Sequence, residues 1–139
     1  MLTHRTKYRP TLENLETRLT PSVYWWQGSV STDGGDGDNW QDSSQLTGTA
    51  PQDDDTVVFD GGSQRGCDLD VINLNAIIGA SDFSYDLNVV GAVSVRGPSS
   101  SFWGNDNVIN VTDGSALLVW GTTFGWAGGS VTGAGVLQV

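Results

Sequence analysis

The chain has few of the side chains that usually carry out acid–base or nucleophilic catalysis. After residue 22 it contains no His, no Lys and no Glu. These residues are common general bases, and His is the usual partner that activates a serine nucleophile. A glycine-rich loop that ends in Lys and cradles phosphate is also absent from the sequence. The sequence therefore predicts a protein that is not an enzyme.

Cysteine and long apolar runs are equally scarce. Cys67 is the only cysteine, so the chain cannot form an internal disulfide, and we expect a small buried apolar residue there. Zinc binding would need a cluster of Cys or His side chains. No apolar run approaches the roughly 18 residues of a membrane span, and the N-terminus lacks the apolar segment of a standard secretory signal.

Basic residues are few and lie mainly at the N-terminus. Four of the six precede Pro21, whereas the chain from Val23 onward has fourteen Asp and only Arg65 and Arg96. This body has a net charge of −12 and repels phosphate, so nucleic acids and anionic membranes are poor partners for it. The break in composition divides a basic leader, residues 1–22, from an acidic body.

The leader has the pattern of a short amphipathic helix, because Leu12, Leu15 and Leu19 fall on one helical face. Residues 9–22, RPTLENLETRLTPS, resemble the R-P-x-L-E-x-L-E-x-R-x-x-P leader found on large cell-surface and secreted proteins of planctomycete-type bacteria. The resemblance implies export or surface display, and hence an extracellular or cell-surface location.

The body is rich in Gly, Ser, Thr, Asn, Asp and Val, and its short apolar runs alternate with turn residues. This pattern predicts many short strands and no long helix. The apolar runs are Thr56–Phe59, Leu69–Ile78, Leu87–Val95, Val108–Val111, Ala116–Trp120 and Val136–Val139.

A shift of 22 residues brings apolar positions of the body into register. It aligns Leu87 with Ile109 and Val131, Val95 with Leu117 and Val139, and Phe102 with Phe124. A turn of this length cannot bury its own apolar side chains, but the next turn, about 4.8 Å away, can cover them. The period predicts an all-β parallel solenoid with turns of about 22 residues. A β-sandwich, in which strands recur every 8–12 residues or so, is the alternative.

Several segments of the body resemble autotransporter-type β-helix passenger domains. They are YWWQG at 24–28, DNW at 38–40, PQDDDTVVF at 51–59 and GSVTGAGVLQV at 129–139. The resemblance implies a right-handed parallel β-helix, with an entry or capping segment at residues 23–64 and solenoid turns at 65–139. The pattern stops at Val139 without a capping element, so we expect part of a longer architecture or end-to-end association with another chain.

Two groups of carboxylates are candidate calcium ligands. Asp33, Asp36 and Asp38 lie in a glycine-rich stretch close to the G-G-x-G-x-D calcium repeat, although the EF-hand spacing fails. Asp53 and Asp55 would share one face of a strand and could converge on a cation. The alternative for both groups is that the carboxylates solvate turns and begin strands.

Tryptophan is abundant, with six residues in 139. A row of exposed Trp103, Trp120 and Trp126 on one face of a solenoid would offer stacking surfaces to the sugar rings of a glycan. The alternative is that these indoles fill the core, since Trp is usually well buried.

Together these features predict a non-enzymatic secreted or cell-surface β-helix module with a scaffolding or adhesive role. Its expected partners are an extracellular glycan or a cell-surface protein. One alternative is a carbohydrate-binding or carbohydrate-active β-helix, with Asp pairs acting as in hydrolases, or Arg65 or Arg96 with calcium acting as in lyases. Another is a surface module stabilised by calcium.

Overall fold

Short runs of alternately buried and half-buried residues form the strands of this protein. A computed structural model describes residues 21–120 and 123–139, so the predicted leader lies outside the described residues except for Pro21 and Ser22. The strands are β1 (Val23–Trp26), β2 (Trp40–Asp42), β3 (Thr56–Phe59), β4 (Cys67–Leu69), β5 (Ile72–Leu74), β6 (Ala76–Gly79), β7 (Leu87–Val89), β8 (Ala92–Val95), β9 (Ser101–Trp103), β10 (Val108–Val111), β11 (Ala116–Val119), β12 (Phe124–Trp126), β13 (Ser130–Thr132) and β14 (Val136–Gln138).

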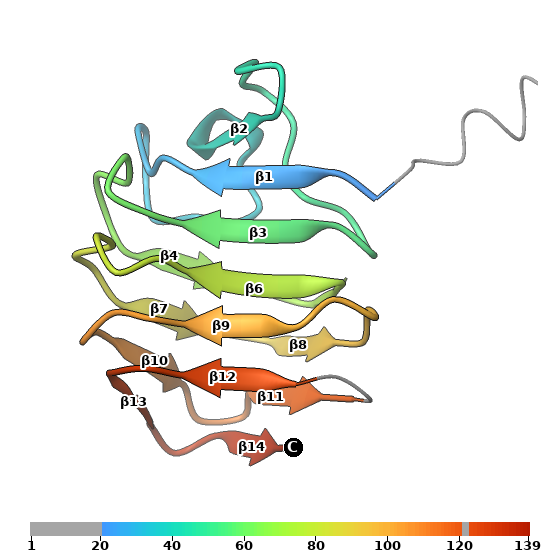
Figure 1. Ribbon diagram of the computed structural model, residues 1–139, viewed down its shortest axis with the longest axis vertical. Coiled ribbons are helices and arrows are strands. Elements are labelled where there is room, and N and C mark those ends of the chain that lie inside the picture. Colours follow the sequence, from blue (N-terminus) through green and yellow to red (C-terminus); the bar gives the residue numbers. More distant parts are fainter. Residues whose placement is uncertain (1–20, 121–122) are drawn as a thin grey trace, which may run out of the picture.

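The strands form three sheets that run the length of a coil (Figure 1). Sheet A has the order β12-β9-β6-β3-β1-β2, sheet B the order β13-β10-β7-β4, and sheet C the order β14-β11-β8-β5. Neighbouring strands are parallel in all three sheets, except that β2 pairs antiparallel with β1. This is a parallel β-solenoid, as the 22-residue period predicts, and not a β-sandwich.

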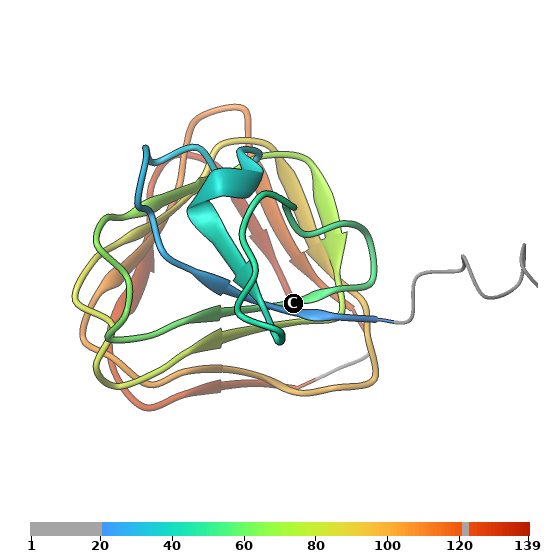
Figure 2. The same cartoon turned by 90° about the horizontal axis from the view of Figure 1, so that it is seen from above.

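The coil is three-sided and right-handed. Seen from its N-terminal end, the chain runs clockwise through sheets A, B and C as it moves away from the viewer (Figure 2). Besides the strands, the described residues contain one short 3-10 helix, η1 (Gly37–Asn39). None of their helices is long and apolar enough to cross a membrane.

The predicted register is confirmed in sheet B. Ile109 of β10 pairs with Leu87 of β7 on one side and with Val131 of β13 on the other. Leu87 and Ile109 are fully buried, so one inward column of side chains continues through successive turns. The 22-residue spacing therefore describes this sheet correctly.

The predicted register is wrong in the other two sheets. Leu117 of β11 pairs with Val93, not Val95, and its partner in β14 is Leu137, not Val139. The corner between β7 and β8 has two residues, whereas the corner between β10 and β11 has four, so the period changes within one turn. In sheet A, Phe102 pairs with Gly125, one residue beyond the predicted Phe124.

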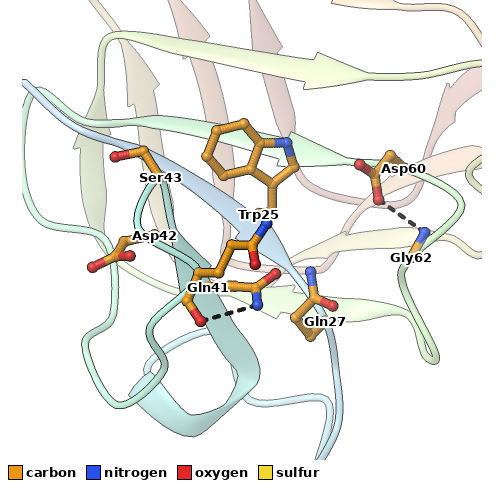
Figure 3. Close-up of a pocket in the computed structure, with 8 residues that line it drawn as sticks. Trp25, Gln27, Gln41, Asp42, Ser43, Asp60 and Gly62 are labelled. Carbon is orange, nitrogen blue, oxygen red and sulfur yellow. Dashed lines mark hydrogen bonds between the residues drawn. The ribbon is translucent and has the colours of Figure 1, made fainter.

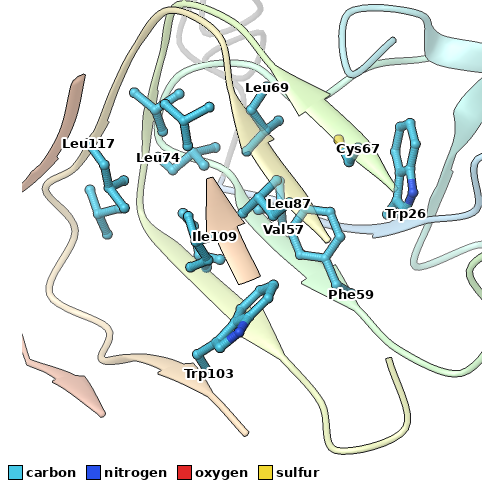
Figure 4. Close-up of a cluster of buried hydrophobic side chains, with 14 of the residues drawn as sticks. Trp26, Val57, Phe59, Cys67, Leu69, Leu74, Leu87, Trp103, Ile109 and Leu117 are labelled. Carbon is cyan, nitrogen blue, oxygen red and sulfur yellow. The ribbon is translucent and has the colours of Figure 1, made fainter. Parts of the chain in front are cut away.

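Inward side chains from all three sheets fill the coil (Figure 4). Aliphatic residues such as Leu87 and Leu117 line sheets B and C, and a cluster of aromatic rings lies against sheet A. Phe59 lies at the centre of this cluster, with its ring centroid 6.0 Å from that of Trp40 and 6.2 Å from that of Trp103. Such edge-to-face contacts stabilise a core beyond the area that they bury.

Cys67 lies fully buried in sheet B, paired with Leu87. Burial raises the pKa of its thiol well above the ordinary value, and the nearby carboxylates of Asp68 and Asp33 add to the shift. The side chain therefore behaves as the small apolar core residue that the sequence predicts.

Candidate functional site

The structure separates the three tryptophans that the sequence analysis grouped. Trp103 is fully buried, whereas Trp120 and Trp126 are each 45% exposed. Trp126 is the register neighbour of Trp103 in sheet A, and Trp120 follows β11 of sheet C. The three indoles therefore do not form the exposed row that a glycan-stacking surface was expected to need.

Three tryptophans are structural, as their hydrogen bonds show. The indole N–H of Trp26 donates to the carbonyl of Arg65 at 2.8 Å, that of Trp40 to Gly34 at 2.9 Å, and that of Trp103 to Asn107 at 3.0 Å. All three side chains are fully buried. Each therefore fills the core and also satisfies a backbone carbonyl of a loop.

The carboxylates of the Asp53–Asp55 segment bind backbone amides. The Asp53 side chain accepts from the N–H of Asn73 at 2.9 Å. The side chain of Asp55, which is buried, accepts from the N–H groups of Ser22 and Gln52, both at 2.8 Å. Asp55 thus holds the start of β3 against the residue that precedes β1, which is a structural use of a carboxylate.

The carboxylates of the other candidate calcium group close turns in the loop before β2. The side chain of Asp33 accepts from the N–H of Gly35 at 2.8 Å, and that of Asp36 from the N–H of Asp38 at 3.0 Å. Within residues 21–120 and 123–139, no three Asp, Glu, His or Cys side chains gather as a metal site would require.

One outer face of the solenoid is apolar. The middle residue of each sheet A strand points outward, and pairing places Trp25 beside Val58, Val58 beside Ile78, and Ile78 beside Phe102. Their inward neighbours on the strands, such as Trp26 and Phe59, are buried, as the alternation of a strand requires. We call Trp25, Val58, Ile78 and Phe102 the outer ladder.

The outer faces of the other two sheets are mainly polar. On sheet B the outward positions are Asp68, Asn88, Asn110 and Thr132. The amide of Asn88 donates to Asp68 at 2.8 Å, and that of Asn110 donates to Asn88 at 3.3 Å. On sheet C the hydroxyl of Ser94 donates to Asn73. The outer ladder therefore distinguishes sheet A from both other faces.

An open hollow of about 410 Å³ lies at the Trp25 end of the outer ladder (Figure 3). We call it the Trp25 hollow. Figure 3 shows the indole between Ser43 on one side and Asp60 on the other, with Gln27 and Gln41 below it. The lining residues are Trp25, Gln27, Gln41, Asp42, Ser43, Gln45, Asp60 and Gly62.

Three segments distant in sequence build this hollow. β1 supplies Trp25 and leads into Gln27, β2 supplies Gln41 and Asp42, and the turn after β3 supplies Asp60 and Gly62. Trp25 pairs with Gln41 on one side and with Val58 on the other, so its backbone is held in the sheet. The site therefore lies on a rigid part of the fold.

Sequence analysis did not identify the Trp25 hollow. A signal was available, because Tyr24, Trp25 and Trp26 are consecutive in one predicted strand, and alternation must turn Trp25 away from its two neighbours. The polar residues from β2 and from the turn after β3 could be joined to it only by the pairing of strands.

The chain has no match among protein-family models, curated proteins or solved structures at the level of significance that would indicate a relative.

Proposed function

We propose that this protein is a non-enzymatic module of the cell surface or the extracellular space, in which a rigid β-solenoid presents sheet A as an adhesive face. The observation that supports this function is the outer ladder: one outer face carries an unbroken line of apolar side chains from Trp25 to Phe102, and the other two faces are mainly polar. A contiguous apolar surface of this kind is typical of a binding surface.

The solenoid suits a scaffolding role because its parts are held before any partner arrives. Each strand of sheet A between β1 and β9 is paired on both sides, and the side chains beneath the ladder are packed aromatic and aliphatic residues. Binding to a preorganised surface loses little conformational entropy. A face of this kind can bind by small contacts repeated along the axis.

An adhesion assay tests the proposal. Beads coated with the full chain are counted on immobilised bacterial cell envelopes and on a blocked surface. Replacing Val58, Ile78 and Phe102 together by Thr removes the apolar contacts but keeps residues that favour strands. We expect about tenfold fewer adherent beads, since hot-spot contacts dominate binding.

A matched control changes the outer face of sheet B. Replacing Asn88 and Asn110 together by Thr introduces the same residue type on another outer face, and adhesion should stay at the level of the unchanged chain. Circular dichroism and thermal unfolding establish that both variants fold. Equal adhesion of the sheet A variant and the unchanged chain would refute the proposal.

The location is tested separately through the leader. In a producing cell, the full chain should be recovered at the cell surface or in the medium, and deletion of residues 1–20 should retain it inside. Recovery of both forms inside the cell would contradict a surface role.

A further inference from the structure

We infer that the Trp25 hollow binds an uncharged glycan, with a sugar ring stacked on the Trp25 indole and its hydroxyl groups bound by the surrounding amides and carboxylates. The inference rests on the proposed adhesive function and names the ligand class for one end of the same face. It moves the glycan site away from Trp103, Trp120 and Trp126.

The first argument is the state of the indole. Trp26, Trp40 and Trp103 are fully buried and bonded to backbone carbonyls, whereas Trp25 is only partly buried at the surface. Within the described residues the indole N–H of Trp25 has no hydrogen-bond partner. The apolar ring face and the free N–H match the two kinds of surface that a sugar presents, its C–H face and its hydroxyl groups.

The second argument is that the polar groups around the ring are oriented and still have capacity to bind. One oxygen of Asp60 accepts from the N–H of Gly62 at 2.9 Å, and one oxygen of Asp42 accepts from the N–H of Ser44 at 2.8 Å. The Gln41 amide donates to the carbonyl of Gln45 at 3.1 Å.

In each of these three side chains the internal hydrogen bond occupies one polar atom. The second carboxylate oxygen of Asp42 and of Asp60, and the carbonyl oxygen of Gln41, remain as acceptors. Fixed acceptors around an aromatic ring recognise a ligand rich in hydroxyl donors at a small entropic cost.

The third argument concerns charge. The hollow contains Asp42 and Asp60, and the body from Val23 onward has a net charge of −12. An anionic glycan would be repelled, so the charge favours an uncharged one. A basic peptide could satisfy the carboxylates, but four of the lining side chains are neutral amides and a hydroxyl, and only one aromatic ring is available to a cation.

The geometry also suggests a polymer in preference to a single sugar. The hollow of about 410 Å³ falls in the range of roughly 300–1,000 Å³ that small-molecule sites occupy, which is room for a short oligosaccharide. Phe102 is 43% exposed and lies three strands from Trp25, at about 14 Å from strand spacings of about 4.8 Å. A long glycan that lies along the coil axis would reach both rings.

Binding is measured by calorimetry and Trp fluorescence with the full chain. The probes are cellohexaose, N-acetylchitohexaose and mannohexaose, and polygalacturonate serves as the anionic comparison. At least one uncharged hexasaccharide should bind, and polygalacturonate should not. Trp25→Ala should weaken binding about tenfold or more, and Trp25→Phe should recover part of it, since a smaller ring remains for stacking. Trp120→Ala, which removes an exposed indole elsewhere, should have no effect.

The length of the glycan separates the two rings. Phe102→Ala should weaken binding of the corresponding long polymer and leave binding of the hexasaccharide within about twofold, because the second ring lies at a distance. Weaker binding of both by the Phe102 variant, or of neither, would overturn the axial arrangement.

Three results would overturn the glycan inference. They are no binding of any uncharged hexasaccharide at 10 mM or so, a level at which even the weakest specific sites are occupied, binding that Trp25→Ala leaves unchanged, and salt-sensitive binding of an oligolysine peptide that requires Trp25. The proposed function fails on a different result, which is unchanged adhesion of the Val58, Ile78 and Phe102 variant. Loss of that adhesion without any glycan binding would keep the adhesive face and remove the glycan.

Discussion

The ring centroids of Trp26 and Trp40 lie 5.0 Å apart, at an interplanar angle of 69°. Both rings are fully buried, and β2, which begins with Trp40, pairs antiparallel with β1 at the edge of sheet A. This edge-to-face pair covers the N-terminal end of the aromatic cluster, where a parallel coil would otherwise expose its core. The segment from β1 to β2 is thus the cap of the solenoid, and the Trp25 hollow lies on its outer side.

Truncation of the cap tryptophan should destabilise the whole coil. Trp40→Ala removes a fully buried indole and its contacts with Trp26 and Phe59, and we expect the free energy of unfolding to fall by about 3–5 kcal/mol. Urea denaturation followed by circular dichroism measures the change. Trp120→Ala, at an indole that is 45% exposed, is the control and should cost less than about 1 kcal/mol. Similar losses in the two variants would show that the pair does not close the coil.

Replacement of Asn39 should open the loop that joins β1 to η1. Its side-chain oxygen accepts from the N–H groups of Val30 and Ser31, and its amide nitrogen donates to the Ser31 hydroxyl and the Asp33 carbonyl. The residue is fully buried, so Asn39→Ala leaves unpaired polar groups and should cost about 2–3 kcal/mol.

Hydrogen exchange locates the effect of this change. Protection of the amides of Val30 and Ser31 should be lost in Asn39→Ala, and Asn39→Asp should retain more of it because the acceptor oxygens remain. Asn110→Ala, which loses one bond of 3.3 Å on the outer face of sheet B, should leave these amides protected. Protected amides in Asn39→Ala would contradict the assignment of Asn39 as the organiser of the loop.

The register of sheet B could be predicted from sequence because its repeating unit does not change in length. Leu87-Asn88-Val89 and the segment from Ile109 to Val111 are 22 residues apart and have the same alternation. The register of sheet C could not be predicted in this way, since the corner before β11 is two residues longer than the corner before β8. Turn residues at a corner permit such insertions, because they lie outside the core.

The candidate site was harder to predict than the fold, because side chains of one type have opposite roles. Trp25 and Trp26 are adjacent, yet one lines a surface hollow and the other is fully buried. Which of them points outward depends on the phase of the strand, and a shift by one residue reverses it. Asp55 shows the same limit, since its carboxylate binds backbone amides in a sequence that equally suits a calcium ligand.

A side chain at Gly79 should disturb the aromatic cluster. Gly79 is in β6, beside Trp103 in register, and a Cβ atom at this position would overlap the six-membered ring of Trp103. Gly79→Ala should therefore cost about 1–3 kcal/mol through overpacking. In a Trp103→Leu background the added cost should shrink, and a double-mutant cycle measures this coupling. Gly35→Ala is the control, as its Cβ would meet only the end of the Asp33 side chain, at 3.2 Å. Equal costs of Gly79→Ala in both backgrounds would exclude the contact with Trp103.

The Cys67 thiol should be inert in the folded protein and should make folding sensitive to alkaline pH. Burial raises its pKa well above the ordinary value, and Asp68 and Asp33 raise it further. The unfolded chain then loses the thiol proton at lower pH than the folded chain does, so this contribution to stability is complete below a pH of about 8.5–9 and falls as the pH rises through the folded pKa. Urea midpoints between pH 7 and pH 10.5 or so, a range that spans the thiol pKa, measure the loss.

Cys67→Ala is the matched variant for this pH dependence, because it keeps a small apolar residue and removes the titrating group. Its overall stability should be somewhat lower, and its stability should decline less between pH 8 and pH 10.5 or so than that of the unchanged chain, as the thiol titrates there. In parallel, a thiol reagent such as DTNB should react with the unchanged chain at pH 8 only after urea is added, since the thiolate is the reactive form and Cys67 is fully buried. Rapid reaction of the folded protein would show that the coil opens at sheet B, and equal pH profiles of the two chains would remove Cys67 as the source of the alkaline sensitivity.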